Sequence, residues 1–209
     1  MRNFFITGGA RSGKSAFALS QAQVLPGKKA FIATAMALDD EMKERIEAHK
    51  RQRNSVWDTY EEPIRVAGLV EDLQHRYDVL LIDCLTVWLS NAMHAGLDVM
   101  QEIEKLVGAI IIHRQGKALP VQYAGDPVRL VQTLDNKDIH REEGQGYPVA
   151  GTSPSPAVFI VSNEVGMGIV PANTLAREFR DYQGLLNQRI AGIADEVYFM
   201  VAGIPMKIK

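Results

Sequence analysis

The stretch GGARSGKS at residues 8–15 decides the fold class of this chain. It matches the pattern G-x-x-x-x-G-K-[ST], with an apolar, strand-like run at 3–7 before it and a helical segment at 13–24 after it. Glycines let backbone N–H groups turn towards phosphate oxygens, and the helix N-terminus adds positive potential. We therefore predict a phosphate-binding P-loop, because a glycine turn without a ligand would not need this strand and helix around it.

The loop supplies the first candidate site residues. In a P-loop the lysine, here Lys14, reaches the β and γ phosphates, and the Ser15 hydroxyl binds Mg²⁺. Lys14 is accordingly a candidate catalytic residue. The predicted nucleotide-binding residues of the loop are Gly8, Gly9, Ala10, Arg11, Ser12, Gly13, Lys14 and Ser15.

Strand-like and helix-like patterns alternate along the rest of the chain. Apolar, strand-like runs occur at 29–34, 77–83 and 157–162, and a final strand pair flanks Gly203. Helical patterns occur at 39–53, at about 85–112 and at about 173–193, where Asn173 is a plausible N-cap. This alternation predicts an α/β fold with a mainly parallel sheet.

Size and composition narrow the class of protein. A chain of 209 residues can form one sizeable domain, so we expect a single P-loop domain over 1–209. A net charge of −2 gives no sign of nucleic acid as a partner. The single cysteine excludes a disulfide within the chain, and no apolar run is long enough to span a membrane. We expect a cytoplasmic protein.

One segment differs from the rest in composition. Residues 113–156 are polar and rich in glycine and proline, and a compact domain rarely carries so long a loop. We expect a surface insertion that is peripheral to the sheet, either simply solvated or functional.

Polar residues follow several of the predicted strands. Thr34 and Asp83 end the second and third strands, and Asn163 with Glu164 follows the fourth. Ligands of open parallel sheets bind beyond the carboxyl ends of the strands, so one composite site is expected there. Asp83 can hold magnesium or be a simple turn residue. Glu164 can act as a base or metal partner, or cap the backbone.

His49 lies in a helix that is otherwise full of charged side chains. Lys50, Arg51 and Arg53 follow it closely and provide a suitable environment for phosphates. Histidine can act as a covalent nucleophile, and its ordinary pKa near 6.5 leaves the ring largely neutral at pH 7. The alternative is a half-buried helix histidine without a chemical role.

Four stretches together resemble one enzyme family. They are GGARSGKS at 8–15, DDEMKERIEAHKRQR at 39–53, DCLTVWLSN at 83–91 and the long block at 161–209. They look like the bifunctional adenosylcobinamide kinases / adenosylcobinamide-phosphate guanylyltransferases of cobalamin biosynthesis. The resemblance excludes 113–156, a segment longer than expected for the family.

The resemblance implies two reactions and a fold. A nucleoside triphosphate, ATP or GTP, would phosphorylate adenosylcobinamide, and GMP from GTP would then join that phosphate with release of pyrophosphate. The resemblance also implies a RecA-like, mainly parallel sheet flanked by helices with an antiparallel C-terminal strand, and a homotrimer.

The resemblance further assigns residues. It implies that His49 takes the GMP covalently. The magnesium roles of Ser15 and Asp83 rest on the P-loop pattern itself. Asn163 and Glu164 remain possible additional site residues. The residues that would line the GTP site outside the P-loop are Thr34, Ala35, Met36, Lys50, Arg51, Gln52, Arg53, Glu61 and Asp83.

Two other functions fit parts of the pattern. A P-loop small-molecule kinase without guanylyl transfer explains the loop and Asp83 but leaves His49 without a task. The second is a nucleotide-switched binding protein. The absence of a guanine-reading N-K-x-D motif weighs against it, because LDNKDI at 134–139 has Ile139 where that motif requires aspartate.

Overall fold

A computed structural model describes residues 2–36, 56–115 and 156–209. Its centre is a seven-stranded sheet in the order β3-β2-β4-β5-β1-β6-β7. All neighbouring strands are parallel except β6 and β7, which are antiparallel. The strands are β1 (Arg2–Gly8), β2 (Lys29–Ala33), β3 (Trp57–Glu61), β4 (Val79–Asp83), β5 (Ala157–Val161), β6 (Glu196–Val201) and β7 (Ile204–Lys207).

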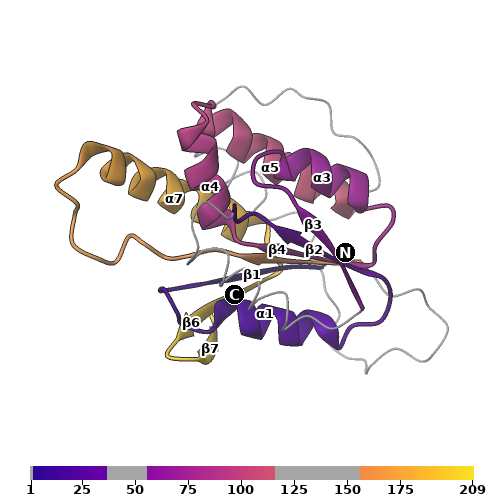
Figure 1. Ribbon diagram of the computed structural model, residues 1–209. Coiled ribbons are helices and arrows are strands. Elements are labelled where there is room, and N and C mark those ends of the chain that lie inside the picture. The colour runs from indigo at the N-terminus through magenta and orange to yellow at the C-terminus, as the bar shows by residue number, and fades with distance from the viewer. Residues whose placement is uncertain (1, 37–55, 116–155) are drawn as a thin grey trace, which may run out of the picture.

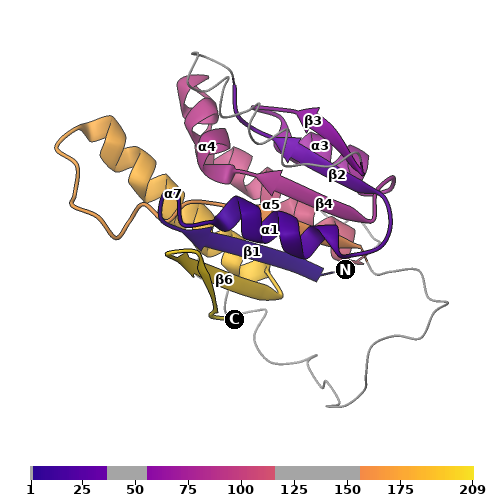
Figure 2. The ribbon, with the colours of Figure 1, turned by 60° about the horizontal axis from the view of Figure 1, so that its bottom comes forward.

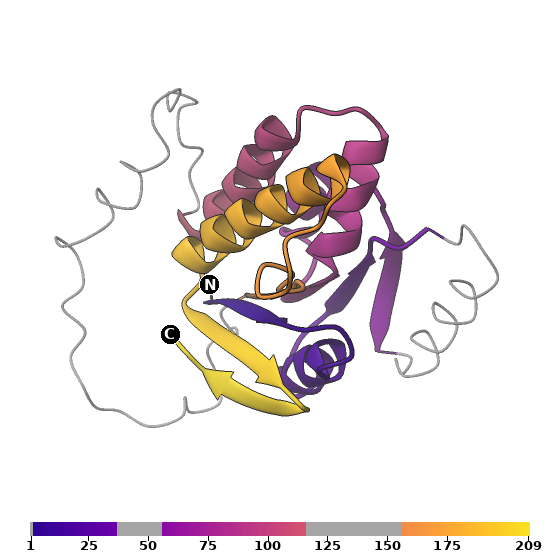
Figure 3. The same cartoon turned by 90° about the vertical axis from the view of Figure 1, so that its left-hand side faces the viewer.

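Helices cover both faces of this sheet (Figure 1). One face carries α1 (Lys14–Gln23), which contacts β1, β4 and β5. The opposite face carries a layer of four helices that contact one another, as Figures 2 and 3 show. These helices are α3 (Val66–Leu73), α4 (Leu85–His94), α5 (Val99–Gln115) and α7 (Thr174–Ile193).

Alternating residues of the strands contribute side chains to two separate hydrophobic cores, one on each face of the sheet. Ile32, Leu80 and Ile160 point to the four-helix layer and are fully buried there. Phe31 and Leu81, their neighbours along the chain, point to the α1 face. Burial on both faces explains why these strands are continuously apolar, and it fixes their register because a one-residue slip would exchange the two cores.

The register aligns the carboxyl ends of the strands. Glu61, Ala33, Asp83 and Val161 pair in one row across β3, β2, β4 and β5. Val161 in turn pairs with Ile6, two residues before the end of β1. The residues that follow each strand are therefore brought to one edge of the sheet, where the P-loop also begins.

The expected α/β architecture is confirmed: the sheet is mainly parallel, flanked by helices, and ends in an antiparallel strand. Asn173 is the N-cap of α7, its side chain accepting a hydrogen bond from the Ala176 amide. The helical stretch at 85–112 is two helices, because the chain turns between α4 and α5 at Gly96, which has a φ of 67°. The expected helix at 39–53 lies outside the described residues.

Two elements were not expected from the sequence. Strand β3 has only one buried residue, Trp57, because it is the edge strand of the sheet, and α3 packs against α5. Helix α5 also runs to Gln115 and so includes the first residues of the expected insertion. Across the described ranges, no helix combines the length and the apolar character needed to cross a membrane.

Candidate active site

The P-loop joins the end of β1 to the start of α1 through an unusual backbone path. Gly8 and Gly13 have positive φ angles of 146° and 91°, and Arg11 has a φ of 55°. A side chain at Gly8 would place its Cβ 2.5 Å from the Met200 carbonyl oxygen, so only glycine fits there. Gly13 is the N-cap of α1 and lies against Gly203, which supports the loop from the β6–β7 turn.

The Lys14 side chain folds back over the loop. Its ammonium group donates to the Gly9 carbonyl at 2.5 Å and to the Ser12 hydroxyl at 3.4 Å. Burial lowers the pKa of Lys14, while the nearby Cys84 and Asp83 oppose this shift. The structure thus brings Lys14 and Asp83 into electrostatic contact, although they lie on different strand-to-helix connections.

Asp83 is anchored through the residue after it. The Cys84 amide donates to the Thr34 hydroxyl at 3.0 Å, and that hydroxyl donates to the Cys84 carbonyl at 2.8 Å. Asn91 of α4 donates to the Thr34 carbonyl at 2.9 Å and to the Pro63 carbonyl at 3.1 Å. One buried amide side chain therefore ties together the chain segments that follow β2 and β3.

Glu164 belongs to a turn next to the P-loop. Its amide donates to the Gly8 carbonyl at 2.9 Å, and its carboxylate accepts from the Gly166 amide at 2.6 Å. Arg180 of α7 donates to the Gly166 carbonyl at 2.7 Å. The backbone-capping role that the sequence left open is therefore present in the structure.

A buried polar network holds Asn163 from two helices. The Thr86 hydroxyl accepts from the Asn163 amide at 2.7 Å, and Asn187 donates to the Asn163 carbonyl at 3.0 Å. The side-chain oxygen of Asn187 (Oδ1) accepts from the Ser162 hydroxyl at 2.8 Å and from the Gln183 side-chain amide at 3.0 Å. Sequence reasoning did not identify this network, and the only sequence signal is the presence of polar residues at core-facing positions of α7.

Comparison with known proteins identifies the family. The sequence model described as "Cobinamide kinase / cobinamide phosphate guanyltransferase", CobU, matches residues 4–122 and 128–208. The chain belongs to the CobU family. The match covers the P-loop, the His49 segment and Asp83, and it extends over most of 113–156, where the resemblance had not been expected.

Three relatives of the CobU family resemble the whole chain. The "Bifunctional adenosylcobalamin biosynthesis protein CobU" of Salmonella typhimurium is 38% identical over 98% of each chain. Its namesake in Escherichia coli is 35% identical over 98% of each chain. CobP of Pseudomonas aeruginosa, "Bifunctional adenosylcobalamin biosynthesis protein CobP", is 35% identical over 98% of this chain and 95% of its own.

Among solved structures, the fold has a distant likeness to a "prototypical ATPase from the type III secretion system of pathogenic bacteria". The sequences are 10% identical, and the TM-score is 0.43 over 99% of this chain and 56% of the ATPase. So weak a likeness has no bearing on the activity of a CobU-family chain.

The structure of this CobU-family chain gathers part of the predicted site. The residues that lie at or after the carboxyl ends of the strands are Thr34, Ala35 and Met36 after β2, Glu61 at the end of β3, Asp83 at the end of β4, and Asn163 and Glu164 after β5. The loop itself consists of Gly8, Gly9, Ala10, Arg11, Ser12, Gly13, Lys14 and Ser15. Glu61 is exposed at the sheet edge, whereas Thr34 is fully buried. His49, Lys50, Arg51, Gln52 and Arg53 lie outside the described residues.

The donor set at the sheet edge suits a magnesium ion. Ser15 supplies a hydroxyl and Asp83 a carboxylate, and both are hard oxygen donors of the kind that Mg²⁺ prefers. Among the described residues, no group of three or more His, Cys, Asp or Glu side chains could hold a metal by itself. A P-loop magnesium site needs no such cluster, because substrate phosphates and water complete the coordination.

Proposed function

We propose that this chain phosphorylates cobinamide with a nucleoside triphosphate and then transfers GMP from GTP to the new phosphate. The observation that carries this proposal is the match to the CobU family along almost the whole chain, combined with a P-loop that brings Lys14 to Asp83. The curated relatives are each named as bifunctional, which supports two reactions rather than one.

The kinase step relies on positioning and charge. Backbone N–H groups of the P-loop and the Lys14 ammonium group would bind the phosphates, and the proposed acceptor is the aminopropanol hydroxyl of adenosylcobinamide. Ser15 and Asp83 would hold Mg²⁺, which when bound offsets negative charge on the phosphates. The γ-phosphorus then bonds to the substrate hydroxyl oxygen, whose proton is released to water. The bond to the bridging oxygen breaks, and the nucleoside diphosphate leaves.

The transferase step uses His49 as the nucleophile. Its neutral ring nitrogen attacks the α-phosphorus of GTP, a P–N bond forms, and pyrophosphate leaves. A phosphate oxygen of cobinamide phosphate then attacks the same phosphorus, the P–N bond breaks, and the imidazole is regenerated. Two easier transfers replace one difficult one. Support comes from the sequence, because His49 lies within the matched range and is followed by three basic residues within the next four positions.

The remaining assignments belong to the same proposal. Thr34, Ala35, Met36, Glu61 and the basic segment at 50–53 are proposed to line the GTP site with the P-loop. The protein is proposed to act in the cytoplasm as a homotrimer, without nucleic acid as a partner.

Labelled GTP tests the proposal directly. GTP labelled at the α-phosphate should leave label on the protein that is lost in acid and stable in base, as expected for a P–N bond. GTP labelled only at the γ-phosphate should leave none. His49→Ala should abolish the label and guanylyl transfer while retaining cobinamide phosphorylation at least in part, and His75→Ala serves as the matched histidine control.

The outcomes separate the alternatives. If His49→Ala still takes label from the α-phosphate, another residue is the acceptor. Transfer of GMP without any labelled protein would show direct transfer between substrates. Phosphorylation of cobinamide with no guanylyl transfer at all would support the small-molecule kinase, and absence of turnover with cobinamide would support the nucleotide-switched binding protein.

A further inference from the structure

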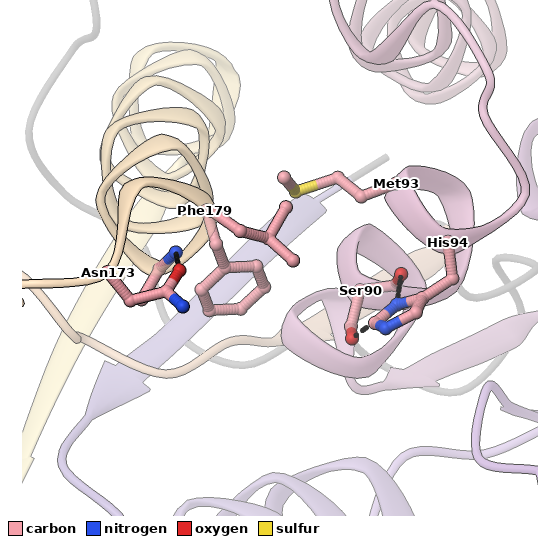
Figure 4. A pocket seen from close by; sticks show the side chains of 7 residues that line it. Ser90, Met93, His94, Asn173 and Phe179 are labelled. Atoms are coloured by element: carbon pink, nitrogen blue, oxygen red, sulfur yellow. Dashed lines mark hydrogen bonds between the residues drawn. The ribbon is translucent and has the colours of Figure 1, made fainter.

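A pocket of about 380 Å³ lies between the end of α4 and the start of α7. Its volume falls within the range of small-molecule sites, roughly 300–1,000 Å³. Figure 4 shows side chains from the two helices facing each other across it. The lining residues are Ser90, Met93, His94, Asn173, Leu175, Ala176 and Phe179.

The pocket combines an apolar floor with polar groups. Met93 and Phe179 line it and also pack against the main core, so the floor is firmly supported. The His94 ring donates from Nδ1 to the Ser90 carbonyl at 2.7 Å, which leaves Nε2 as an acceptor. The Asn173 carbonyl oxygen caps α7, which leaves the amide nitrogen as a donor.

Exposed apolar side chains also occur in the segment that leads into the pocket. Leu175, at the second residue of α7, is 55% exposed although it lines the pocket. In the segment between β5 and α7, Met167 is 80% exposed, Ile169 97% and Val170 62%. Three of these exposed side chains fall within four consecutive residues, and contiguous exposed apolar surface is a mark of a binding site.

The pocket lies on the catalytic side of the molecule. Helix α4 begins directly after Asp83 and Cys84, and the segment that follows Asn163 and Glu164 leads into α7. The first turns of α7 extend past the carboxyl edge of the sheet (Figure 1). Both helices that line the pocket therefore follow strands whose carboxyl ends carry the proposed phosphate site.

We propose that this pocket and the exposed segment 167–170 bind the corrin ring of the cobinamide substrate. The inference rests on the proposed function. A corrin is a large ring with many methyl groups and primary amides on its rim, which match the apolar floor, the Asn173 donor and the His94 acceptor. Its reacting hydroxyl is at the end of a flexible side chain, so the ring can bind at a distance from the phosphates.

The lining favours a corrin over the guanine of GTP. Guanine presents neighbouring N–H donors that a carboxylate would satisfy, and no acidic side chain lines the pocket. The position of the pocket between two helices also suits a ligand that enters from outside the sheet edge. The pocket accommodates one edge of the ring, and the exposed side chains at 167–170 cover more of its apolar surface.

The test compares two identical substitutions in α7. Leu175→Glu puts a charge into the pocket at the first turn of a helix, where an acidic residue is tolerated. Leu185→Glu makes the same change at a residue that is 40% exposed, three turns further along and outside the pocket. We expect Leu175→Glu to raise the KM for cobinamide roughly tenfold or more, because a corrin bound in the pocket would remove the new carboxylate from water. The KM for GTP and labelling of the protein by α-labelled GTP should not change.

The outcomes keep this inference separate from the proposed function. An unchanged cobinamide KM in Leu175→Glu overturns the pocket assignment, as does an equal effect of Leu185→Glu. A change of oligomeric state in Leu175→Glu, measured by analytical ultracentrifugation, assigns the surface to a second copy of the chain and also overturns it. If the wild type has no activity, the proposed function fails; cobinamide titrated without nucleotide then still tests the pocket.

Discussion

The Thr34 hydroxyl bonds to both backbone groups of Cys84, accepting from its amide at 3.0 Å and donating to its carbonyl at 2.8 Å. Thr34 is fully buried and follows β2, whereas Cys84 follows β4. The two bonds hold the peptide groups on both sides of Cys84, the first of which joins it to Asp83. The side chain of Thr34 thus acts on the site through the backbone of a neighbouring strand.

Thr34→Val should lower the kcat for cobinamide phosphorylation about tenfold, with a smaller effect on the KM for GTP. Valine has the shape of threonine but takes away the hydroxyl that pairs the Cys84 amide, at a cost of about 1–3 kcal/mol of unfolding free energy. The Cys84 carbonyl also loses a bond but still accepts from the Trp88 amide at 3.2 Å. Steady-state kinetics and denaturant unfolding measure the two effects. Thr34→Ser keeps the hydroxyl and should restore kcat; a Ser variant as impaired as Val would contradict the positioning role.

Lys14→Ala should reduce phosphorylation of cobinamide on the order of 100-fold or more, because a group that stabilises transition-state charge is lost. The Lys14 ammonium group already contacts the loop through Gly9 and Ser12 and needs only to turn towards phosphate. Triphosphate binding and turnover are the measurements. Lys28→Ala, which removes a lysine outside the P-loop before β2, is the control. Near-normal kinase activity in Lys14→Ala would place the phosphate site elsewhere.

Cys84 should be unreactive towards alkylating reagents in the folded protein at pH 8. Burial of the thiol, helped by the Asp83 carboxylate, raises the pKa of Cys84 to about 11. Its thiolate fraction at pH 8 is then on the order of 100-fold lower than that of a free cysteine. Iodoacetamide labelling followed by mass spectrometry measures this, and the same protein in guanidinium chloride is the control.

The same pKa shift determines a dependence of stability on pH. The folded pKa lies above the ordinary value of 9.0, so this contribution to the unfolding free energy is complete below about pH 9. It is lost as the pH rises towards 11. Rapid alkylation of the native protein at pH 8 would contradict both statements.

Replacing 116–155 by a short Gly/Ser linker should leave a folded protein. Helix α5 ends at Gln115 and β5 begins at Ala157, and the strands β4 and β5 pair without contributions from the replaced residues. Circular dichroism and thermal unfolding check the fold, and both reactions are then assayed. An unfolded product would mean that the segment contains a core element, while a folded but inactive product would give it a role in catalysis.

Local patterns were enough to predict most of the sheet and the P-loop. Strand β1, the loop and α1 form one continuous motif, and the apolar runs that became β2, β4 and β5 are buried on both faces. Strand β3 was missed because WDTYE alternates too briefly and exposes polar residues at the sheet edge. Its aromatic and β-branched residues, Trp57, Thr59 and Tyr60, were the available signal.

The contacts that complete the site could not be predicted in the same way. Thr34 and Cys84 are 50 residues apart, and Asn91 reaches Thr34 across 57. Such pairs are defined by strand register and helix packing, which no local spacing encodes. The roles proposed for His49 and its basic neighbours stay predictions, since they rest on the family and lie outside the described residues.

The turn between the last two strands supports the first loop of the chain. The Gly203 amide donates to the Ser12 carbonyl at 3.1 Å, and Met200 packs directly against Gly8. Contacts between such distant parts of a chain form late, after the intervening loops have closed. During synthesis on a ribosome, these contacts with the P-loop cannot form until nearly the whole polypeptide has emerged. A chain that stops before Gly203 would lack the amide that binds the Ser12 carbonyl, and its P-loop would have one support fewer.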